Sequence, residues 1–339
     1  MWKIIAQRTI SAAIVLLILS VVCFTLIRIA PGDPVEIYLG RISADDTRGS
    51  GITPAEYQRT AQFLGTNLPA FYIGLTPKMT WHGTDCHYHH WAAGLLGNGS
   101  SLSYRDARPV WEHIAEVLPL TLFINIISLF LTFLIAIPLA TYMVRRHQQW
   151  PDRALSNLLF ALNTIPAFWV GILIVTWAAS QFGAFIGMPI VPYGSSRLGH
   201  ILANIPTLIL PIFCLTYGAV AYITQQLRTA LVAEKQQDYI KTARAKGVSE
   251  NKIIRKHALR NALTPIFGLI NRLVPGLIGG SFLIEIIFNL QGMGQLTYTA
   301  INQHDWPVVM AVVLLTAILS IAGNIVADLL QNYIDPRTI

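Results

Sequence analysis

Long apolar segments recur along the chain at lengths that suit a lipid bilayer. A helix needs about 20 apolar residues to cross the hydrocarbon core. Six segments reach or approach that length: Ile10–Ile29, Leu118–Val144, Ala154–Ser180, Ile205–Ile223, Leu263–Phe288 and Pro307–Leu330. Each is expected to be helical, because an open strand would leave backbone groups unpaired in hydrocarbon. The pattern predicts an all-α integral membrane protein with six transmembrane helices.

The polar segments between these spans divide the chain into three parts. Residues 1–30 hold the N-terminal segment and the first span, residues 31–117 form an extracytoplasmic loop with a His-rich stretch, and residues 118–339 form a five-span core with a cytoplasmic loop at 224–262. Residues 109–118 have helical spacing and predict a surface helix that leads into the second span. Residues 291–307 predict another surface helix. Prolines within the later spans predict kinks, at Pro138, Pro166, Pro211 and Pro275.

Composition and charge support a membrane protein and indicate its topology. Hydrophobic residues make up 53% of the chain and charged residues 12%, against about 25% charged in soluble domains. Of the 24 Lys and Arg, nine lie between Arg228 and Arg260, and six more lie near the chain ends and after the second span: Lys3, Arg8, Arg145, Arg146, Arg153 and Arg337. Basic residues favour the cytoplasmic side, so both termini and the 224–262 loop are expected there. The positive charge is thus a topology signal, and we expect no nucleic-acid partner.

The cytoplasmic loop from Arg228 to Ala262 has its own local pattern. It predicts two short helices, the first ending at Lys246 before Gly247 in a left-handed conformation, and the second capped by Ser249. Tyr239, Ala243 and Gly247 are spaced four apart, so an aromatic and two small residues share one face. Such a face permits close approach of another protein. A basic loop that rests on anionic lipid is the alternative.

The same loop resembles the cytoplasmic coupling loop of binding-protein-dependent ABC importer permeases, in the dipeptide/oligopeptide/nickel branch. The family pattern is Tyr-hydrophobic-x-Thr-Ala-Arg-Ala-Lys-Gly, then His-x-Leu-Arg-Asn-Ala, then Pro. The matching residues here are Tyr239, Ile240, Thr242, Ala243, Arg244, Ala245, Lys246, Gly247, His257, Leu259, Arg260, Asn261, Ala262 and Pro265. Further segments resemble the family at Pro31–Pro34, at Ile165–Phe168, from Glu285 to Gly294 and at Asp335–Arg337.

This resemblance implies a type I ABC importer permease fold and a set of partners. The loop helix around Ala243–Gly247 would dock on a separate ABC ATPase subunit, a second homologous permease would complete the pathway, and an extracytoplasmic binding protein would deliver the solute. No Gly-x-x-x-x-Gly-Lys-Ser/Thr motif occurs in the chain, so no phosphate-binding loop of that kind is encoded. We therefore expect this chain to have no cofactor and no enzymatic activity, and we expect the partner ATPase to bind ATP and Mg²⁺. The resemblance also implies that the chain lies in the inner (cytoplasmic) membrane.

The His-rich stretch at 81–91 is a candidate metal site. Imidazole, thiolate and carboxylate groups that could ligate zinc, nickel or copper are His82, Asp85, Cys86, His87, His89 and His90. The alternative is an interfacial loop in which Trp81, Tyr88 and Trp91 lie at headgroup level. We favour the interfacial interpretation, because the spacing matches no known metal site.

Charged residues in or near the spans are candidates for the translocation pathway. Arg272 lies within the fifth span, where a charge is costly. It would line the pathway and favour an anionic group, or pair with a carboxylate of the partner permease, which we favour. Glu285 is a second pathway candidate, although its place near a span end favours a structural anchor. Arg28, at the end of the first span, fits a snorkelling interfacial residue.

The sequence thus favours an ABC importer permease for dipeptides or oligopeptides. Import of nickel or a metal chelate, and uptake of antimicrobial peptides, remain alternatives within the same branch. An ion-coupled secondary transporter would require ionisable residues or broken helices at mid-membrane in inverted repeats, and only Arg272 lies well inside a span. A membrane-embedded metal hydrolase is a further class, but its His-Glu-x-x-His motif does not occur.

Overall fold

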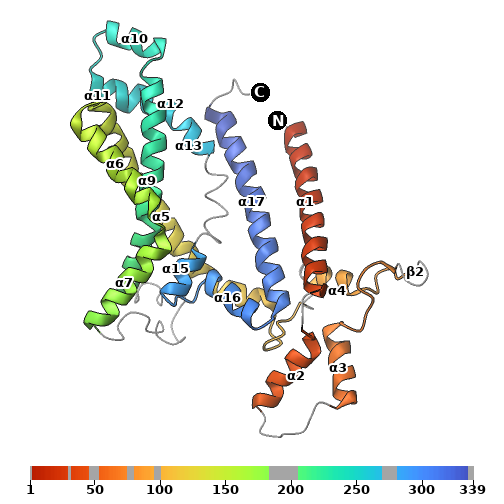
Figure 1. Ribbon diagram of the computed structural model, residues 1–339. Coiled ribbons are helices and arrows are strands. Elements are labelled where there is room, and N and C mark those ends of the chain that lie inside the picture. Colours follow the sequence, from red (N-terminus) through yellow and green to blue (C-terminus); the bar gives the residue numbers. More distant parts are fainter. Residues whose placement is uncertain are drawn as a thin grey trace. The chain divides into compact units, whose positions relative to one another are not determined.

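The computed structural model describes residues 2–29, 32–45, 53–74, 80–94, 101–182, 205–268 and 281–334. The chain divides into two compact units, each described by itself below. The first unit comprises Met1–Val117 and Leu296–Ile318, and the second unit comprises Leu118–Gln295 and Leu319–Ile339. Apart from one antiparallel pair of two-residue strands, β1 (Ile73–Gly74) and β2 (Thr80–Trp81), the regular elements in this described part are helices (Figure 1).

Among its described residues, the first unit has four α-helices before the long helix α5 begins. They are α1 (Trp2–Ile29), α2 (Pro34–Asp45), α3 (Pro54–Leu64) and α4 (His87–Ala93). Helix α3 has a complete capping box, in which the Thr53 side chain accepts from the backbone N–H of Glu56 and the Glu56 carboxylate accepts from the backbone N–H of Thr53. Gly65 ends α3 at φ 69°, a left-handed conformation that glycine adopts without strain.

The second unit is built around α9. Its helices include α6 (Trp150–Thr164), α7 (Ala167–Phe182), α9 (Ile205–Glu234), α10 (Asp238–Ala245), α11 (Glu250–Lys252), the π-helix η2 (Ile253–Ala258), α12 (Leu259–Ala262), α13 (Thr264–Gly268) and α15 (Phe282–Ile287). Helices α6, α7, α12, α13 and α15 all contact α9. Three of the described helices have residues in both units: α5 (Val110–Arg145), α16 (Met293–Asn302) and α17 (Trp306–Ile334).

Part of the predicted membrane topology is confirmed. In the described residues, three helices are long and apolar enough to cross a bilayer: α5, α9 and the Trp306–Ile325 part of α17. Helix α1 contributes a shorter apolar stretch, Ile10–Leu26. The fifth expected span begins with α13 and ends with α15, and the residues between them, Arg272 and Pro275 included, lie outside the described residues. Six spans and cytoplasmic termini therefore remain predictions.

The kink expected at Pro166 is a sharp break in the span over Ala154–Ser180. Helices α6 and α7 meet at an 80° bend. Ile165 is extended there, at φ −80° and ψ 118°, because the ring of Pro166 disfavours helical backbone at the preceding residue. By contrast, Pro138 and Pro211 lie inside continuous helices. The Tyr217 hydroxyl on α9 donates to the Ile165 carbonyl at 2.8 Å and satisfies one acceptor at the bend.

The two predicted surface helices have different outcomes. The segment at 109–118 is not a separate helix but the first turns of α5, with Val110 and Ile114 buried on one face as expected. It stays continuous because buried positions follow at Leu120 and Ile124, beyond Pro119. Helix α16 confirms the prediction of a helix within residues 291–307.

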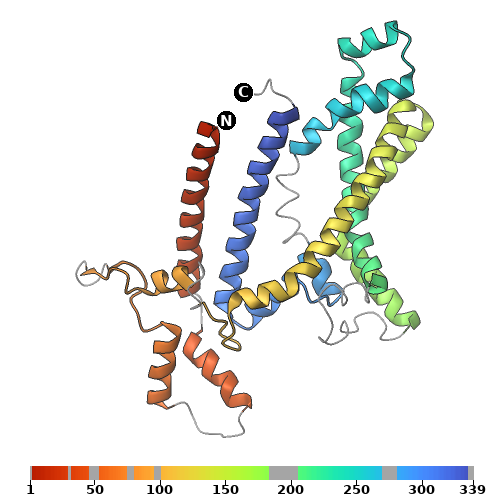
Figure 2. The same ribbon diagram turned by 180° about the vertical axis from the view of Figure 1, so that it is seen from behind.

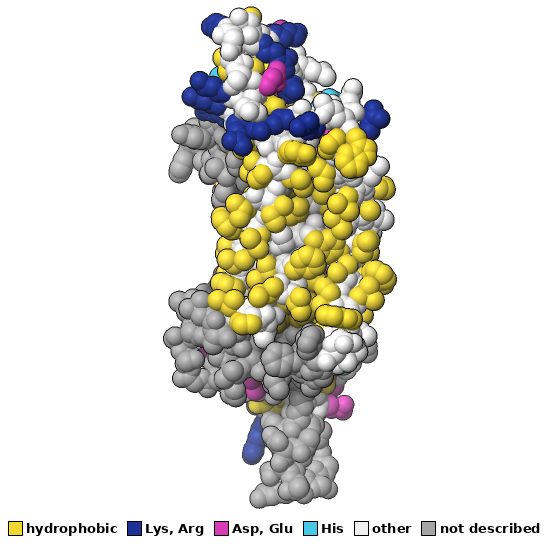
Figure 3. Space-filling view, turned by 90° about the vertical axis from the view of Figure 1, so that its left-hand side faces the viewer, with side chains coloured by type: hydrophobic (Ala, Val, Ile, Leu, Met, Phe, Trp, Pro, Cys, Tyr) yellow, Lys and Arg dark blue, Asp and Glu magenta, His cyan; other side chains and the backbone are white. Residues whose placement is uncertain are grey.

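The surface of the second unit has the distribution of residues expected for a membrane protein. Exposed hydrophobic side chains on α6, α7 and α9 include those of Phe160, Trp169, Trp177 and Phe213. Figure 3 shows a hydrophobic band over these helices, with Lys and Arg gathered at the end that carries α10 to α12. Bare apolar surface of this size is stable against lipid or another apolar protein surface, not against water.

Candidate functional site

The first part of the 224–262 loop ends as the sequence predicts. Helix α10 ends at Ala245, and Gly247 follows with φ +74°. The N–H of Gly247 donates to the Arg244 carbonyl at 2.9 Å, and the N–H of Val248 donates to the Ala243 carbonyl at 3.2 Å. These bonds satisfy carbonyls at the helix end, so the glycine stop is confirmed.

The second part of the loop is less regular than expected. Ser249 occupies the N-cap position with extended backbone, but its side chain makes no capping hydrogen bond, so that part of the prediction is wrong. The helix then passes from α11 into the π-helix η2 and on into α12. π-Helical turns are rare in proteins overall, and those that do occur often lie at functional sites. Here the wider turn accompanies complete burial of Ile253, Ile254 and Ala258.

An apolar cluster fixes the loop against the ends of α5 and α9. Its buried members are Ala140, Val144, Leu227, Leu231, Ile240, Ile253, Ile254, Ala258, Ala262 and Ile266. Ala243 also packs against this cluster, so the predicted stripe of Tyr239, Ala243 and Gly247 is not wholly free for a partner. Figures 1 and 2 show α10, α11 and α12 at the same end of α9 in both views.

Tyr239 joins the two halves of the loop. Its hydroxyl donates to the Glu234 carboxylate and accepts from Asn261 Nδ2 at 3.0 Å. Burial of the phenol, followed by its hydrogen bond to Glu234, raises the pKa of Tyr239 to about 12. Tyr239 and Asn261 therefore hold the loop together from inside this chain.

The remaining loop residues form an exposed, mainly basic surface. Thr242, Ala245, Lys246, Gly247 and Arg260 are exposed, and His257 is half-buried. A Cβ added at Gly247 would have no atom of the described chain within 4 Å.

Arg244 is exposed as well, and it is paired. It donates to Glu250 at 2.5 Å, and this hydrogen bond holds the pKa of Glu250 below its usual value. The pair joins the end of α10 to the start of α11 across Gly247.

An ion pair at the root of the loop was not predicted. Asp152, near the start of α6, has a side chain only 1% exposed and accepts from both Nε and Nη2 of Arg228 on α9, each at 2.7 Å. The backbone N–H of Gln148 donates to the same carboxylate at 2.9 Å. The sequence signal was a lone acidic residue in the basic turn after the second span, but nothing identified a partner 76 residues away.

Glu285 is completely buried, and within the described part of the chain the hydrogen-bond donors to its carboxylate are neutral groups. Thr121 Oγ1 and Ser281 Oγ donate to one carboxylate oxygen at 2.9 and 2.6 Å, and the N–H of Gly294 donates to the other at 2.6 Å. A Cβ at Gly294 would lie 2.6 Å from Phe282 Cα, so only glycine lets this backbone approach. These contacts fit the structural anchor, and a pathway role for Glu285 stays a prediction. Arg272 lies outside the described residues.

The His-rich stretch forms part of an apolar core. Cys86, Tyr88 and Trp91 are buried with Phe24 and Met310. Two of the histidines have other partners: His89 Nδ1 lies 3.1 Å from the Tyr72 hydroxyl, and His82 Nε2 lies 3.0 Å from Thr80 Oγ1. The interfacial alternative is also only partly met, because Trp81 is exposed whereas Tyr88 and Trp91 face inward.

Aromatic packing, not metal ligation, organises this segment. The ring of His87 lies 5.2 Å from that of Phe24. In the part of the chain that the structure describes, no group of three or more His, Cys, Asp or Glu is placed to hold a metal ion. The geometry therefore gives no support to a metal site at His82, Asp85, Cys86, His87, His89 and His90, and that site stays a prediction.

Comparisons with known proteins agree with the loop and the fold. Residues 133–339 match the family model described as binding-protein-dependent transport system inner membrane component, and residues 1–125 match the model of its N-terminal part. The chain belongs to this family. It is therefore a permease of the ABC importer class.

Curated relatives are similar over nearly their whole length. The oligopeptide transport system permease protein AppB of Bacillus subtilis is 30% identical over 98% of both chains. The dipeptide transport system permease protein DppB of Escherichia coli is 27% identical over 94% of this chain and 93% of its own. Among solved structures, a chain of the inward-facing MetNI methionine ABC transporter aligns with a TM-score of 0.52 and 22% identity, covering 67% of this chain and 98% of that chain. That likeness concerns the fold.

Adding one methyl group at Gly294 should destabilise the second unit. The Gly294→Ala side chain would meet backbone atoms of Phe282 that cannot yield without moving α15, and overpacking of this kind costs about 1–3 kcal/mol. Thermal unfolding of the purified protein should show a lower midpoint. Gly218→Ala is the control, since its Cβ meets nothing within 4 Å; equal midpoints for the two variants would contradict the close packing around Glu285.

Removing one member of the Asp152–Arg228 pair should cost more than removing a surface pair. Asp152→Asn would leave the guanidinium of Arg228 without its counter-charge, a loss on the order of 3 kcal/mol. Asp238→Asn is the matched control, because Asp238 pairs with Lys241 at 2.8 Å but both side chains are exposed. The free energy of unfolding, measured by denaturant titration in detergent, should fall clearly only for Asp152→Asn. Similar values for the two variants would show that the buried pair does not fix α6 to α9.

Proposed function

We propose that this chain is a peptide-translocating permease subunit of an ATP-driven importer in the inner (cytoplasmic) membrane, and that a separate ATPase drives it through the 224–262 loop. The observation that carries the proposal is the exposed glycine turn after α10, held on a buried apolar cluster at the end of α9. The family membership of the chain supports the transport role.

The ATPase contact is argued from what the loop leaves exposed. Its aliphatic residues larger than alanine are buried or partly buried within this chain, whereas Thr242, Ala245, Lys246 and Gly247 face outward. Gly247 has no side chain, and no atom of the described chain lies on its open side, so another protein can approach the peptide plane closely. ATP and Mg²⁺ would be bound by that partner, which also carries out hydrolysis.

Movement of the loop would reach the membrane through α9. The apolar cluster joins the loop to Leu227 and Leu231 of α9, and the Arg228–Asp152 pair joins α9 to α6. Further along the same helix, Tyr217 contacts the bend between α6 and α7. A displacement of α10 would therefore be delivered both to α6 and to the bend.

The proposed topology has six spans with both chain ends in the cytoplasm, and two further partners follow from the family. A second homologous permease would complete the pathway, and an extracytoplasmic binding protein would deliver the solute. The exposed apolar faces of α6, α7 and α9 suit lipid and a second permease.

Peptides are the proposed cargo. The similar permeases are named as oligopeptide and dipeptide transport proteins. The His-rich stretch, whose imidazole and thiol groups would suit a metal cargo, contributes instead to an apolar core rich in aromatic rings, so it adds no support for a metal or metal-chelate cargo. Arg272 favoured an anionic cargo group at the sequence level, and that role stays a proposal.

Side chains added at Gly247 should uncouple transport from ATP hydrolysis. Gly247→Asn keeps a residue that tolerates the left-handed conformation, whereas Gly247→Tyr adds both strain and bulk. In the reconstituted complex, we expect peptide uptake per ATP hydrolysed to fall for Gly247→Asn and to fall by at least about tenfold for Gly247→Tyr. The reason is that the partner can no longer approach the backbone, and a tenfold effect corresponds to a loss of about 1.4 kcal/mol of coupling free energy.

The two variants separate docking from backbone strain. If Gly247→Asn behaves as wild type and only Gly247→Tyr lowers stability, the glycine serves the turn and not a docking partner. Normal uptake in Gly247→Tyr, with the chain inserted and the ATPase bound, would refute the assigned role of the loop. Lys241→Asn, also on the exposed part of α10, is the control for a change of surface charge.

A further inference from the structure

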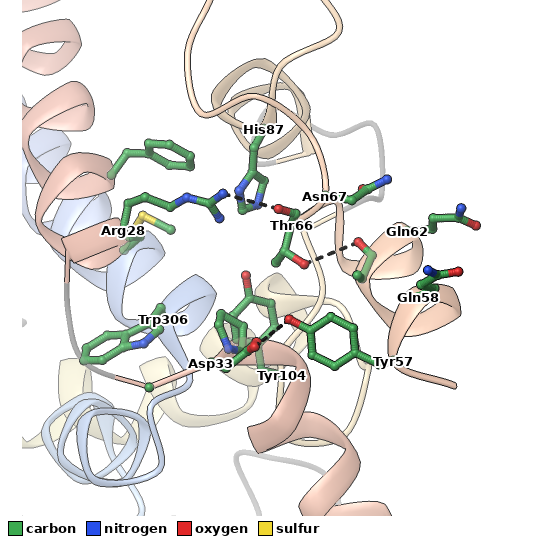
Figure 4. Close-up of a pocket in the computed structure, with 15 residues that line it drawn as sticks. Arg28, Asp33, Tyr57, Gln58, Gln62, Thr66, Asn67, His87, Tyr104 and Trp306 are labelled. Atoms are coloured by element: carbon green, nitrogen blue, oxygen red, sulfur yellow. Dashed lines mark hydrogen bonds between the residues drawn. The ribbon is translucent and has the colours of Figure 1, made fainter. Parts of the chain in front are cut away.

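A cavity of about 780 Å³ lies within the first unit, between the end of α1 and the helices that follow it. This volume is within the range of small-molecule sites, about 300–1,000 Å³. Its walls come from α1, α3, α4, the start of α17 and the segments between them. Figure 4 shows the amide side chains of Gln58, Gln62 and Asn67 on one side of the cavity, and Arg28 and Trp306 on the opposite side.

Two opposite charges face this cavity with hydrogen-bonding capacity to spare. Arg28 makes one hydrogen bond within the described chain, to the Thr66 carbonyl at 3.3 Å, although a guanidinium has five N–H donors. Asp33 accepts from the Tyr57 hydroxyl at 2.6 Å and from the N–H of Val35 at 2.8 Å, and its carboxylate has further lone pairs. The ion pairs found among the described residues include neither side chain. Arg28 is thus turned toward a cavity, and is not explained by snorkelling alone.

The rest of the lining has the character of a peptide site. The aromatic rings of Phe24, Tyr57, Tyr104 and Trp306 offer apolar faces, and the three amides can pair with peptide groups. The amide side chains of Gln58, Gln62 and Asn67 enter no hydrogen bond recorded within the described chain, so their pairing capacity is unused.

A smaller cavity of about 180 Å³ shares Gln62, His87 and Tyr104 with the larger one. Three polar atoms around it lack partners in the described structure: His87 Nδ1, Trp91 Nε1 and Ser101 Oγ. Trp91 and Ser101 are each only 6% exposed. A buried polar group without a partner costs about 1–3 kcal/mol, so these atoms call for polar ligand atoms or water. Burial, with the charge of Arg28, lowers the pKa of His87 to about 4, so the imidazole is neutral near pH 7.

We propose that the larger cavity is a peptide site of the permease itself, which takes a short zwitterionic peptide with its carboxylate at Arg28 and its ammonium group at Asp33. The inference rests on the proposed function, since it assumes that peptides reach this face of the chain. With the chain's N-terminus in the cytoplasm, the cavity at the far end of α1 opens on the side from which solute arrives. The site is formed by this chain, so it is distinct from the site on the solute-binding protein.

Direct binding tests the proposal. The complete permease–ATPase complex, without its binding protein, is placed in nanodiscs and titrated calorimetrically with trialanine and with N-acetyl-trialanine amide, which lacks both charges. Trialanine should bind to the wild-type complex. Arg28→Gln should weaken the affinity for trialanine at least about tenfold, because the variant loses one charge-assisted hydrogen bond to the peptide. The blocked peptide should bind more weakly and be insensitive to Arg28→Gln, and Arg28→Lys should restore part of the affinity for trialanine.

The control is Arg108→Gln, because Arg108 is in the same unit but pairs with Glu112 and Glu116 outside the cavity. Unchanged trialanine affinity in both Arg28→Gln and Asp33→Asn would overturn the proposal. A second pair of results would also overturn it: trialanine fails to saturate the wild-type complex, and the two variants weaken capture of the binding protein. The cavity would then hold a segment of that protein. Insensitivity of the blocked peptide to Arg28→Gln shows that the variant is folded.

Uptake by the complete system separates this inference from the proposed function. Import of trialanine by a wild-type complex that fails the binding test leaves the peptide permease intact and removes only the cavity site. Binding in the cavity by a complex that imports no peptide would instead refute the proposed function and leave the site.

Discussion

Polar groups that are buried, or that lie within apolar helices, need partners within the protein, and this constraint shapes the second unit. The Ile165 carbonyl, at the bend before Pro166, accepts a hydrogen bond from the Tyr217 hydroxyl. The buried Asp152 carboxylate receives both nitrogens of an Arg228 fork. Glu285 receives two hydroxyls and a backbone N–H, which approaches because Gly294 has no side chain. Since hydrocarbon offers no replacement for these bonds, each of them fixes one element to another.

Two of these three polar contacts are made by α9, which also contributes Leu227 and Leu231 to the apolar cluster that holds the 224–262 loop. The loop is consequently not a flexible connection but a continuation of α9, with α10 to α12 packed back on Leu227 and Leu231. The hydroxyl of Tyr239 closes this arrangement between Glu234 and Asn261. A force applied at the exposed Gly247 turn would meet a stiff element, which is what a device for coupling two subunits requires.

Local features were predictable from sequence, and long-range pairings were not. The Gly247 stop follows from the conformational freedom of glycine, and the apolar lengths of α5, α9 and α17 follow from the thickness of the bilayer. Pro166 was expected to kink its span, but sequence does not distinguish an 80° break from the continuous helices at Pro138 and Pro211. The Asp152 partner and the cavity around Arg28 depend on residues far apart in the chain. The inward packing of the His-rich stretch was not evident from sequence, because histidines next to aromatic residues can serve packing as well as metal binding.

The central claim is that the glycine turn of the 224–262 loop meets an ATPase on the cytoplasmic side of the membrane. The most direct measurement places a photo-crosslinking residue at Lys246 in the assembled importer, within native membranes, and identifies the adducts by mass spectrometry. A dominant adduct between this position and the ATPase subunit is the predicted result. Adducts with lipid alone, or with a protein from the outer face, would contradict the account.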